Sequence, residues 1–261
     1  MMSPLKIRYL IYKELRERKI RHIAGFVLLS IISGLFFFPR FFGLDDKFTD
    51  IISTLIPLYQ KSFPLLPGEK LSLIIYTDIF FPVFILIPAI TSPFLGVLES
   101  VIIEKENRTL EGLLSLPLSD KEILFGKMSS SIIAGICITW LLFFIHMVFF
   151  AVYLPNILFF HLLSAKWIFL VLILCPVISY IVNSMGIILA IWLKKLNTAG
   201  NLGIIILCPF FFFVFLISFG KINLNVMSII IMSTIGFIIG SGLFFIAIRL
   251  FNREKLLLRY H

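Results

Sequence analysis

Charge is scarce in this chain. Asp, Glu, Lys and Arg make up 14% of its 261 residues, whereas a soluble domain usually carries about 25%. Apolar residues account for 60% of the chain, and 30 residues are Phe. This composition excludes a soluble globular enzyme, a disordered chain and a nucleic-acid-binding module. It predicts an all-α polytopic membrane protein.

Cysteine and histidine are also few. The cysteines, Cys137, Cys175 and Cys208, each lie inside an apolar run, without C-x-x-C pairs or the spacing of metal ligands. We interpret them as small packing or lipid-facing residues. The four histidines are widely separated, and neither H-E-x-x-H nor G-x-S-x-G occurs. The sequence therefore predicts no metal site and no catalytic residue, and a membrane-embedded enzyme finds no support.

Six apolar segments are long enough to cross a bilayer. About 20 helical residues span its hydrocarbon core, and a helix satisfies its own backbone there. Pro155 and Asn156 divide the longest run, which leaves a short outer piece at residues 157–165. Gly236 and Gly240, with Gly242, give the last span a close-packing face, either for the chain's own bundle or for a second copy. The predicted transmembrane helices are residues 23–39, 79–98, 129–153, 167–193, 202–219 and 226–248.

Basic residues gather on one side of this topology. The two tails and the loops after spans two and four hold most of the 23 Lys and Arg. The positive-inside rule then predicts cytoplasmic termini in a multi-pass protein of the plasma membrane. The net charge of +9 accordingly reflects topology and contact with anionic lipid, not nucleic acid.

Residues 4–22 precede the first span and are strongly basic. Apolar residues recur on one face, and Glu–Arg pairs four residues apart lie on the other. The pattern predicts an N-terminal amphipathic helix along the inner membrane interface, with a simple topogenic charge cluster as the alternative. No small-x-small cleavage pattern follows the first span, so we expect an uncleaved anchor.

The cytoplasmic loop at residues 99–127 is the most informative segment. Leu110, Leu113 and Leu114 share one face of a short predicted helix, which Pro117 ends. Ser119 and Glu122 have the spacing of a capping box, so a second helix is expected to begin there and to continue into span three. The pattern predicts a rigid elbow with an apolar tip. A solvated charged loop is the alternative.

This loop resembles that of the ABC type-2 permease family, the membrane subunits of ATP-binding-cassette transporters. The family pattern runs Glu-x-Glu-x-Gly-Thr-Leu-Glu, then Leu-Leu, Pro-hydrophobic-Ser, Glu-Ile and Gly-Lys. The matching residues here run from Glu104 to Lys127, with Arg108 where the family commonly has Gly. The six predicted spans and the amphipathic N-terminal segment extend the resemblance over the whole chain.

The resemblance implies a division of labour. Two permease chains, identical or different, would form the translocation pathway, and a separate cytoplasmic dimer would bind ATP and Mg²⁺ and hydrolyse the ATP. The elbow would be a coupling helix that docks on this ATPase, and the likeness together with the lack of a large outer domain implies export. That role is carried onto Glu104, Glu106, Thr109, Leu110, Glu111, Leu113, Leu114 and Pro117, with Ser119 and Glu122 as the cap of the helix.

Gly126 and Lys127 imitate part of a P-loop. The complete motif needs Gly five residues before Gly126 and Ser or Thr directly after Lys127, but Lys121 and Met128 occupy these positions. The chain is therefore predicted not to hydrolyse ATP and to need no cofactor of its own.

Polar residues and prolines inside the spans are candidate pathway residues. Pro82 and Pro88 favour kinks in span two, as does Pro93. His146 lies deep in span three, where a functional role competes with a neutral ring bonded to a neighbouring span. Asn183 in span four lines a pathway or holds helices together.

A secondary transporter or channel is the competing interpretation. It would use Asp78, His146 or Glu99 as an ion or proton site and would run on a gradient without an ATPase. No inverted repeat is visible between the two three-span halves, which disfavours this class.

Overall fold

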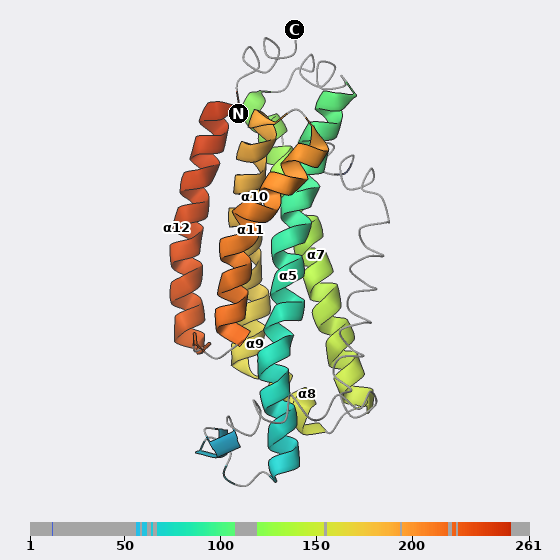
Figure 1. Cartoon of the computed structure of the whole chain (residues 1–261), viewed down its shortest axis with the longest axis vertical. Helices are drawn as coiled ribbons and strands as arrows, with labels where there is room; N and C mark the ends of the chain where they lie inside the picture. The colour runs from blue at the N-terminus through green and yellow to red at the C-terminus, as the bar shows by residue number, and fades with distance from the viewer. Residues whose placement is uncertain are drawn as a thin grey trace.

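A computed structural model describes residues 12, 56–57, 59–61, 64, 67–107, 119–153, 156–193, 195–218, 221–222 and 224–251. Within these ranges the regular structure is helical, which confirms the predicted all-α class for them. The labels follow Figure 1. The elements are α5 (Gly68–Glu106), α7 (Asp120–Tyr153), α8 (Asn156–Leu162), α9 (Ala165–Phe169), the π-helical segment η1 (Leu170–Leu174), α10 (Cys175–Trp192), α11 (Leu196–Ser218) and α12 (Val226–Leu250).

Five segments of the described chain are long and apolar enough to cross a membrane. They correspond to the second to sixth predicted spans. The first predicted span at residues 23–39 and the amphipathic helix at residues 4–22 lie outside the described residues. The five segments are Thr77–Glu106, Asp120–Val152, Ala165–Trp192, Thr198–Ser218 and Val226–Leu250.

Three helices are longer than the predicted spans. α5 runs from Gly68 to Glu106 instead of 79–98, and α11 begins at Leu196 instead of residue 202. α7 begins at Asp120, as the predicted Ser119–Glu122 capping box requires, and continues into span three. Hydropathy marks only the part of a helix that suits hydrocarbon; in α5 and α7, Lys and Glu are good helix formers and let the backbone hydrogen bonds continue into the polar flanks. α7 ends at Tyr153, before Pro155, as the sequence predicts.

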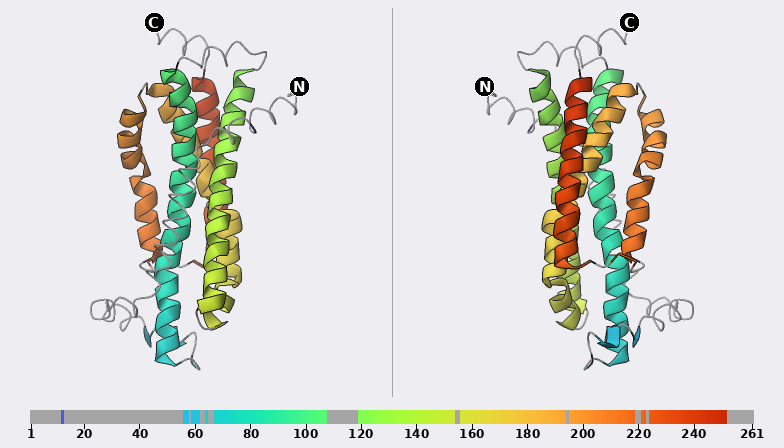
Figure 2. Two further views of the ribbon diagram at one scale, coloured as in Figure 1. Left: turned by 90° about the vertical axis from the view of Figure 1, so that its right-hand side faces the viewer. Right: turned by 90° about the vertical axis from the view of Figure 1, so that its left-hand side faces the viewer.

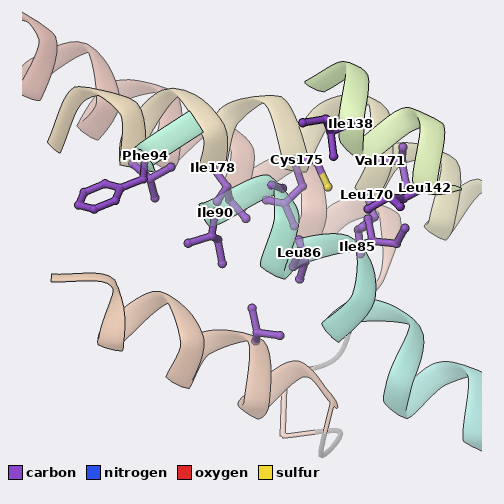
Figure 3. Packing of buried hydrophobic residues seen from close by; sticks show 14 of the residues in the cluster. Ile85, Leu86, Ile90, Phe94, Ile138, Leu142, Leu170, Val171, Cys175 and Ile178 are labelled. Carbon is purple, nitrogen blue, oxygen red and sulfur yellow. The ribbon is translucent and has the colours of Figure 1, made fainter. Parts of the chain in front are cut away.

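α5 is the central helix of the bundle. α10 packs most extensively against it, α7 and α11 also contact it, and α12 packs on α10 and η1. Figures 1 and 2 show α5 running the length of the bundle, with its N-terminal end projecting beyond the neighbouring helices. The core lies where α5 meets α7, η1 and α10, and Figure 3 shows Ile85, Leu86 and Ile90 of α5 among residues of the other elements.

Pro93 links α5 to two neighbouring helices. It has no N–H, so the carbonyl of Ala89 lacks its donor within α5, and Ser179 Oγ of α10 donates to that oxygen at 2.9 Å. Asn183 Nδ2, one turn further along α10, donates to the Pro93 carbonyl at 3.2 Å. On the α7 side, a Cβ placed on Gly135 would lie 2.8 Å from the Pro93 ring. The backbone defect at Pro93 is thus a point where α7 and α10 both contact α5.

A second proline defect is satisfied in the same way. The N–H of Cys175 reaches back to Leu170 within η1, and Pro176 has no N–H to offer the next carbonyl, that of Val171. Trp140 Nε1 of α7 donates to the Val171 oxygen at 3.3 Å. Interhelical side chains therefore replace backbone bonds that proline removes, as expected where water is absent.

The glycine face of α12 serves the chain's own bundle. A Cβ on Gly236 would lie 2.8 Å from Val177, and one on Gly240 would lie 2.6 Å from Tyr180, both on α10. The structure thus chooses between the two uses that the sequence left open. The prediction was wrong for Gly242, because two residues on from Gly240 the helix has turned away from α10, and a Cβ there would have no neighbouring atom within 4 Å.

Replacing Gly240 with Ala should therefore lower stability. The added methyl forces Tyr180 away from its position, at a cost of about 1–3 kcal/mol. The matched control is Gly242→Ala on the same helix, where the added methyl meets no atom and should raise stability by about 0.5–1 kcal/mol, because Ala favours a helix interior over Gly. Thermal unfolding of the detergent-purified variants measures both. Equal melting temperatures for the two variants would contradict the packing of α12 on α10.

Candidate functional site

The last three residues of α5 each bond a different helix. Glu104 pairs with Lys127 near the start of α7, Lys105 reaches the end of α10, and Glu106 reaches the start of α11. We call Glu104, Lys105, Glu106 and Lys127 the junction. The four helix ends that it joins lie at the same end of the bundle (Figure 1).

The Glu104–Lys127 pair joins α5 to α7. Lys127 Nζ lies 2.8 Å from Glu104 Oε2, and the side chain of Lys127 is 0% exposed while that of Glu104 is 16% exposed. Lys127 Nζ also donates to the carbonyl of Ser100 at 2.9 Å. A buried ammonium needs this kind of pairing, because removal from water is otherwise costly.

Lys105 closes the end of α10. The residue is 4% exposed, and its Nζ donates to the carbonyls of Ala190, Ile191 and Leu193 at 2.6, 3.2 and 3.4 Å. The last carbonyls of a helix lack intrahelical donors and carry the negative end of its dipole. A lysine from another helix therefore acts as the C-terminal cap of α10.

Two helices, α7 and α11, start at this end of the bundle, and Ser119 and Glu106 accept hydrogen bonds from backbone N–H groups of their first turns. Glu106 Oε1 accepts a hydrogen bond from the backbone N–H of Leu196 at 3.0 Å, where an acidic group suits the positive end of the α11 dipole. At the start of α7, Glu122 Oε2 accepts from the Ser119 N–H at 2.8 Å and Ser119 Oγ accepts from the Glu122 N–H at 3.3 Å. These are the two reciprocal bonds of a capping box.

Sequence reasoning missed two members of the junction, Lys105 and Lys127. A signal was present, because each lysine shares a helix face with buried apolar residues three and four positions earlier. Lys127 follows Ile123 and Leu124, and Lys105 follows Val101 and Ile102 in the same way. A charge on an apolar face predicts a buried partner, although the pattern does not name it.

The other predicted coupling residues cannot be placed. Thr109, Leu110, Glu111, Leu113, Leu114 and Pro117 lie outside the described residues, in the segment that joins α5 to α7. Glu104 and Glu106 are described, and their carboxylates bond helices of this chain.

The candidate pathway residues Pro82, Pro88, His146 and Asn183 are all buried in the helix bundle. His146 Nδ1 bonds the Leu142 carbonyl of its own helix at 2.7 Å, since a residue four positions earlier is within reach on a helix. The bond from His146 to a neighbouring span stays a prediction. The ring contacts Phe81 and Phe84 of α5.

No three His, Cys, Asp or Glu side chains in the described ranges are grouped so as to hold a metal ion. The junction consists of charged side chains that connect the ends of α7, α10 and α11 to the last turn of α5.

Comparison with known protein families decides the class. Residues 9–240 match the family model described as ABC-2 family transporter protein. The chain belongs to the ABC-2 transporter family. No curated protein and no solved structure was found to match it. Together with the five apolar helices, membership indicates a multi-pass, membrane-embedded permease subunit of an ABC transporter, of the kind that partners with an ATP-binding subunit.

Proposed function

We propose that this ABC-2 family protein is the permease of an exporter. Two such chains form the translocation pathway, and each couples to a separate cytoplasmic ATPase through residues 104–117, with both termini in the cytoplasm. The observation that carries the proposal is the junction, because it connects the end of the loop-bearing helix to three other helices. ATP and Mg²⁺ belong to the partner subunit.

The junction supports coupling because it gives the loop stiff attachments. Residues 108–118 join the end of α5 to the start of α7, and the Glu104–Lys127 pair ties the two attachment points together. The capping box makes the Ser119 end a defined helix start. A displacement of the loop would then move α5 and α7 as a unit, and Lys105 and Glu106 would pass it to α10 and α11.

Within the proposal, the predicted coupling residues fall into two groups. Glu104 and Glu106 bond the chain's own helices, so in this proposal they transmit motion within the permease. The contact with the ATPase then falls to the apolar tip, Leu110, Leu113 and Leu114, with Thr109, Glu111 and Pro117 shaping the segment.

The gradient-driven alternative receives less support from the geometry. Asp78 is already bonded to His161 and Lys166, and the His146 ring nitrogen is bonded to a backbone carbonyl in a buried position. Neither group offers an open ion site. Transport that continues on an ion gradient without ATP would restore this alternative.

The test is reconstitution of the chain with its co-purifying ATP-binding subunit in proteoliposomes. The permease alone should show no ATPase activity, and the complex should show activity above that of the ATP-binding subunit alone. Changing Leu110, Leu113 and Leu114 together to Asp should reduce this stimulation by about fivefold or more, because three charges replace an apolar contact.

The matched control for that variant is Lys121→Met. Lys121 is exposed on the first turn of α7, outside the apolar tip, and its replacement should leave stimulation unchanged. Undiminished stimulation by the triple Asp variant would refute the coupling role of the tip.

A further inference from the structure

Four side chains from separate segments meet at the end of α5 that lies opposite the junction. Asp78 of α5 accepts a hydrogen bond from Tyr59 Oη at 2.9 Å through Oδ2. Its Oδ1 lies 2.8 Å from His161 Nε2 of α8 and 3.1 Å from Lys166 Nζ of α9. We call these four residues the distal cluster. Figure 1 places α8 and α9 beside this half of α5.

Asp78 is the centre of the distal cluster. Its side chain is 11% exposed, so the carboxylate relies on its protein partners, whereas Lys166 is 27% exposed. Burial and the nearby Asp78 carboxylate raise the pKa of Tyr59, so its phenol stays protonated and donating at physiological pH. Because Lys166 lies nearer the surface, water can replace Asp78 as its partner when the helices separate.

The distal cluster lies over a pair of buried aromatic residues, Trp167 and Phe81, which we call the plug. Trp167 is fully buried directly after Lys166, and Lys166 Nζ lies 4.5 Å from the centre of its ring. The Trp167 ring stands perpendicular to Phe81 of α5 with 4.8 Å between ring centres. Separation of Asp78 from Lys166 would therefore remove the cover of Trp167 and loosen its contact with α5.

We propose that the distal cluster is a latch that holds the far end of the transport pathway closed and releases when α5 moves. This inference rests on the proposed function, because the junction is the source of the motion. α5 is one continuous helix from Asp78 to Glu104, so a displacement at one end reaches the other. His161 sits on α8, which the junction does not hold, whereas Lys166 sits on α9, the start of the continuous span Ala165–Trp192 whose other end Lys105 bonds. Movement of α5 relative to α8 therefore strains the bond between Asp78 and His161 first, and His161 also contacts the Trp167 ring.

A single-tryptophan reporter tests the latch. The chain has three Trp, at positions 140, 167 and 192, and the double variant W140F/W192F leaves Trp167 as the only one. Quenching of its fluorescence by iodide reports access of water to the plug. In the complex with an ATP-binding subunit whose own Trp residues are replaced by Phe, trapping the ATPase with ATP and vanadate should raise the quenching constant of Trp167 by about twofold or more over the nucleotide-free state.

Variants of the cluster should open the latch without nucleotide. Asp78→Asn removes the charge that Lys166 pairs with, and Lys166→Ala removes the pairing from the other side while leaving the buried residue in place. Both should raise iodide quenching of Trp167 in the permease alone. The control is Lys221→Ala, an exposed lysine in the loop between α11 and α12, which should leave quenching unchanged.

The outcomes separate the latch from the proposed function, because ATPase stimulation is measured on the same samples. If the permease stimulates its partner but trapping leaves Trp167 quenching unchanged, the latch is wrong and the permease function stands. If the permease fails to stimulate, the proposed function is wrong, and the latch falls with it. If Lys166→Ala and Lys221→Ala give the same iodide quenching constant for Trp167, the cluster does not cover Trp167.

Discussion

Changing Glu104 to Gln is expected to lower the free energy of unfolding by about 3–5 kcal/mol, because it leaves the buried Lys127 ammonium without its counter-charge. Lys127 is 0% exposed, so solvent cannot replace the lost carboxylate. The same variant should also uncouple ATP hydrolysis from transport, since it detaches the start of α7 from the end of α5. Thermal unfolding and reconstituted transport measure the two effects.

A double-mutant cycle separates this pair from general damage. Adding Lys127→Met to Glu104→Gln removes the orphaned charge, so the double variant should be more stable than Glu104→Gln alone. The exchanged pair, Glu104→Lys with Lys127→Glu, should recover part of the loss, but a glutamate at 127 cannot donate to Ser100. Additive losses in the cycle would show that the two side chains do not interact.

Changing Lys105 to Met is expected to lower the free energy of unfolding by about 2–4 kcal/mol. Methionine keeps much of the apolar stem but removes the charged donor from three carbonyls at the end of α10, and hydrogen bonds from charged donors are worth about 1.5–3 kcal/mol each. A loss of this size corresponds to a fall in Tm of roughly 4–16 °C for a chain of this length.

The matched control is Lys195→Met. Lys195 is exposed in the short connection between α10 and α11, close in sequence to the carbonyls that Lys105 caps. Its replacement should leave both Tm and ATPase stimulation near the wild-type values. If Lys105→Met behaves like this control, the cap contributes nothing and α10 is held by apolar packing alone.

The local features of this protein could be predicted from its sequence. Span positions follow from apolar runs, the break before α8 follows from Pro155, and the start of α7 follows from the Ser119–Glu122 spacing. Each depends on residues within a few positions of one another, so a pattern is sufficient.

The tertiary partners of polar groups could not be predicted. Lys127 and Glu104 are far apart in sequence, and the choice of Glu104 over other nearby acids depends on how α5 and α7 cross. The same holds for Ser179, which bonds a carbonyl only because Pro93 freed it and α10 lies alongside. His146 Nδ1 bonds the carbonyl four residues earlier in its own helix, a partner that the sequence prediction did not name.

The most direct test of the account is a crosslink from the loop between α5 and α7 to the ATP-binding subunit. Cys137, Cys175 and Cys208 are replaced by Ala, and a cysteine introduced in place of Leu113 carries a photoactivatable crosslinker in native membranes. The account predicts a covalent adduct with the ATP-binding subunit, and no labelling of this cysteine by a membrane-impermeant thiol reagent added to intact cells. Labelling from outside the cell, or crosslinking that never reaches the ATP-binding subunit, would contradict it.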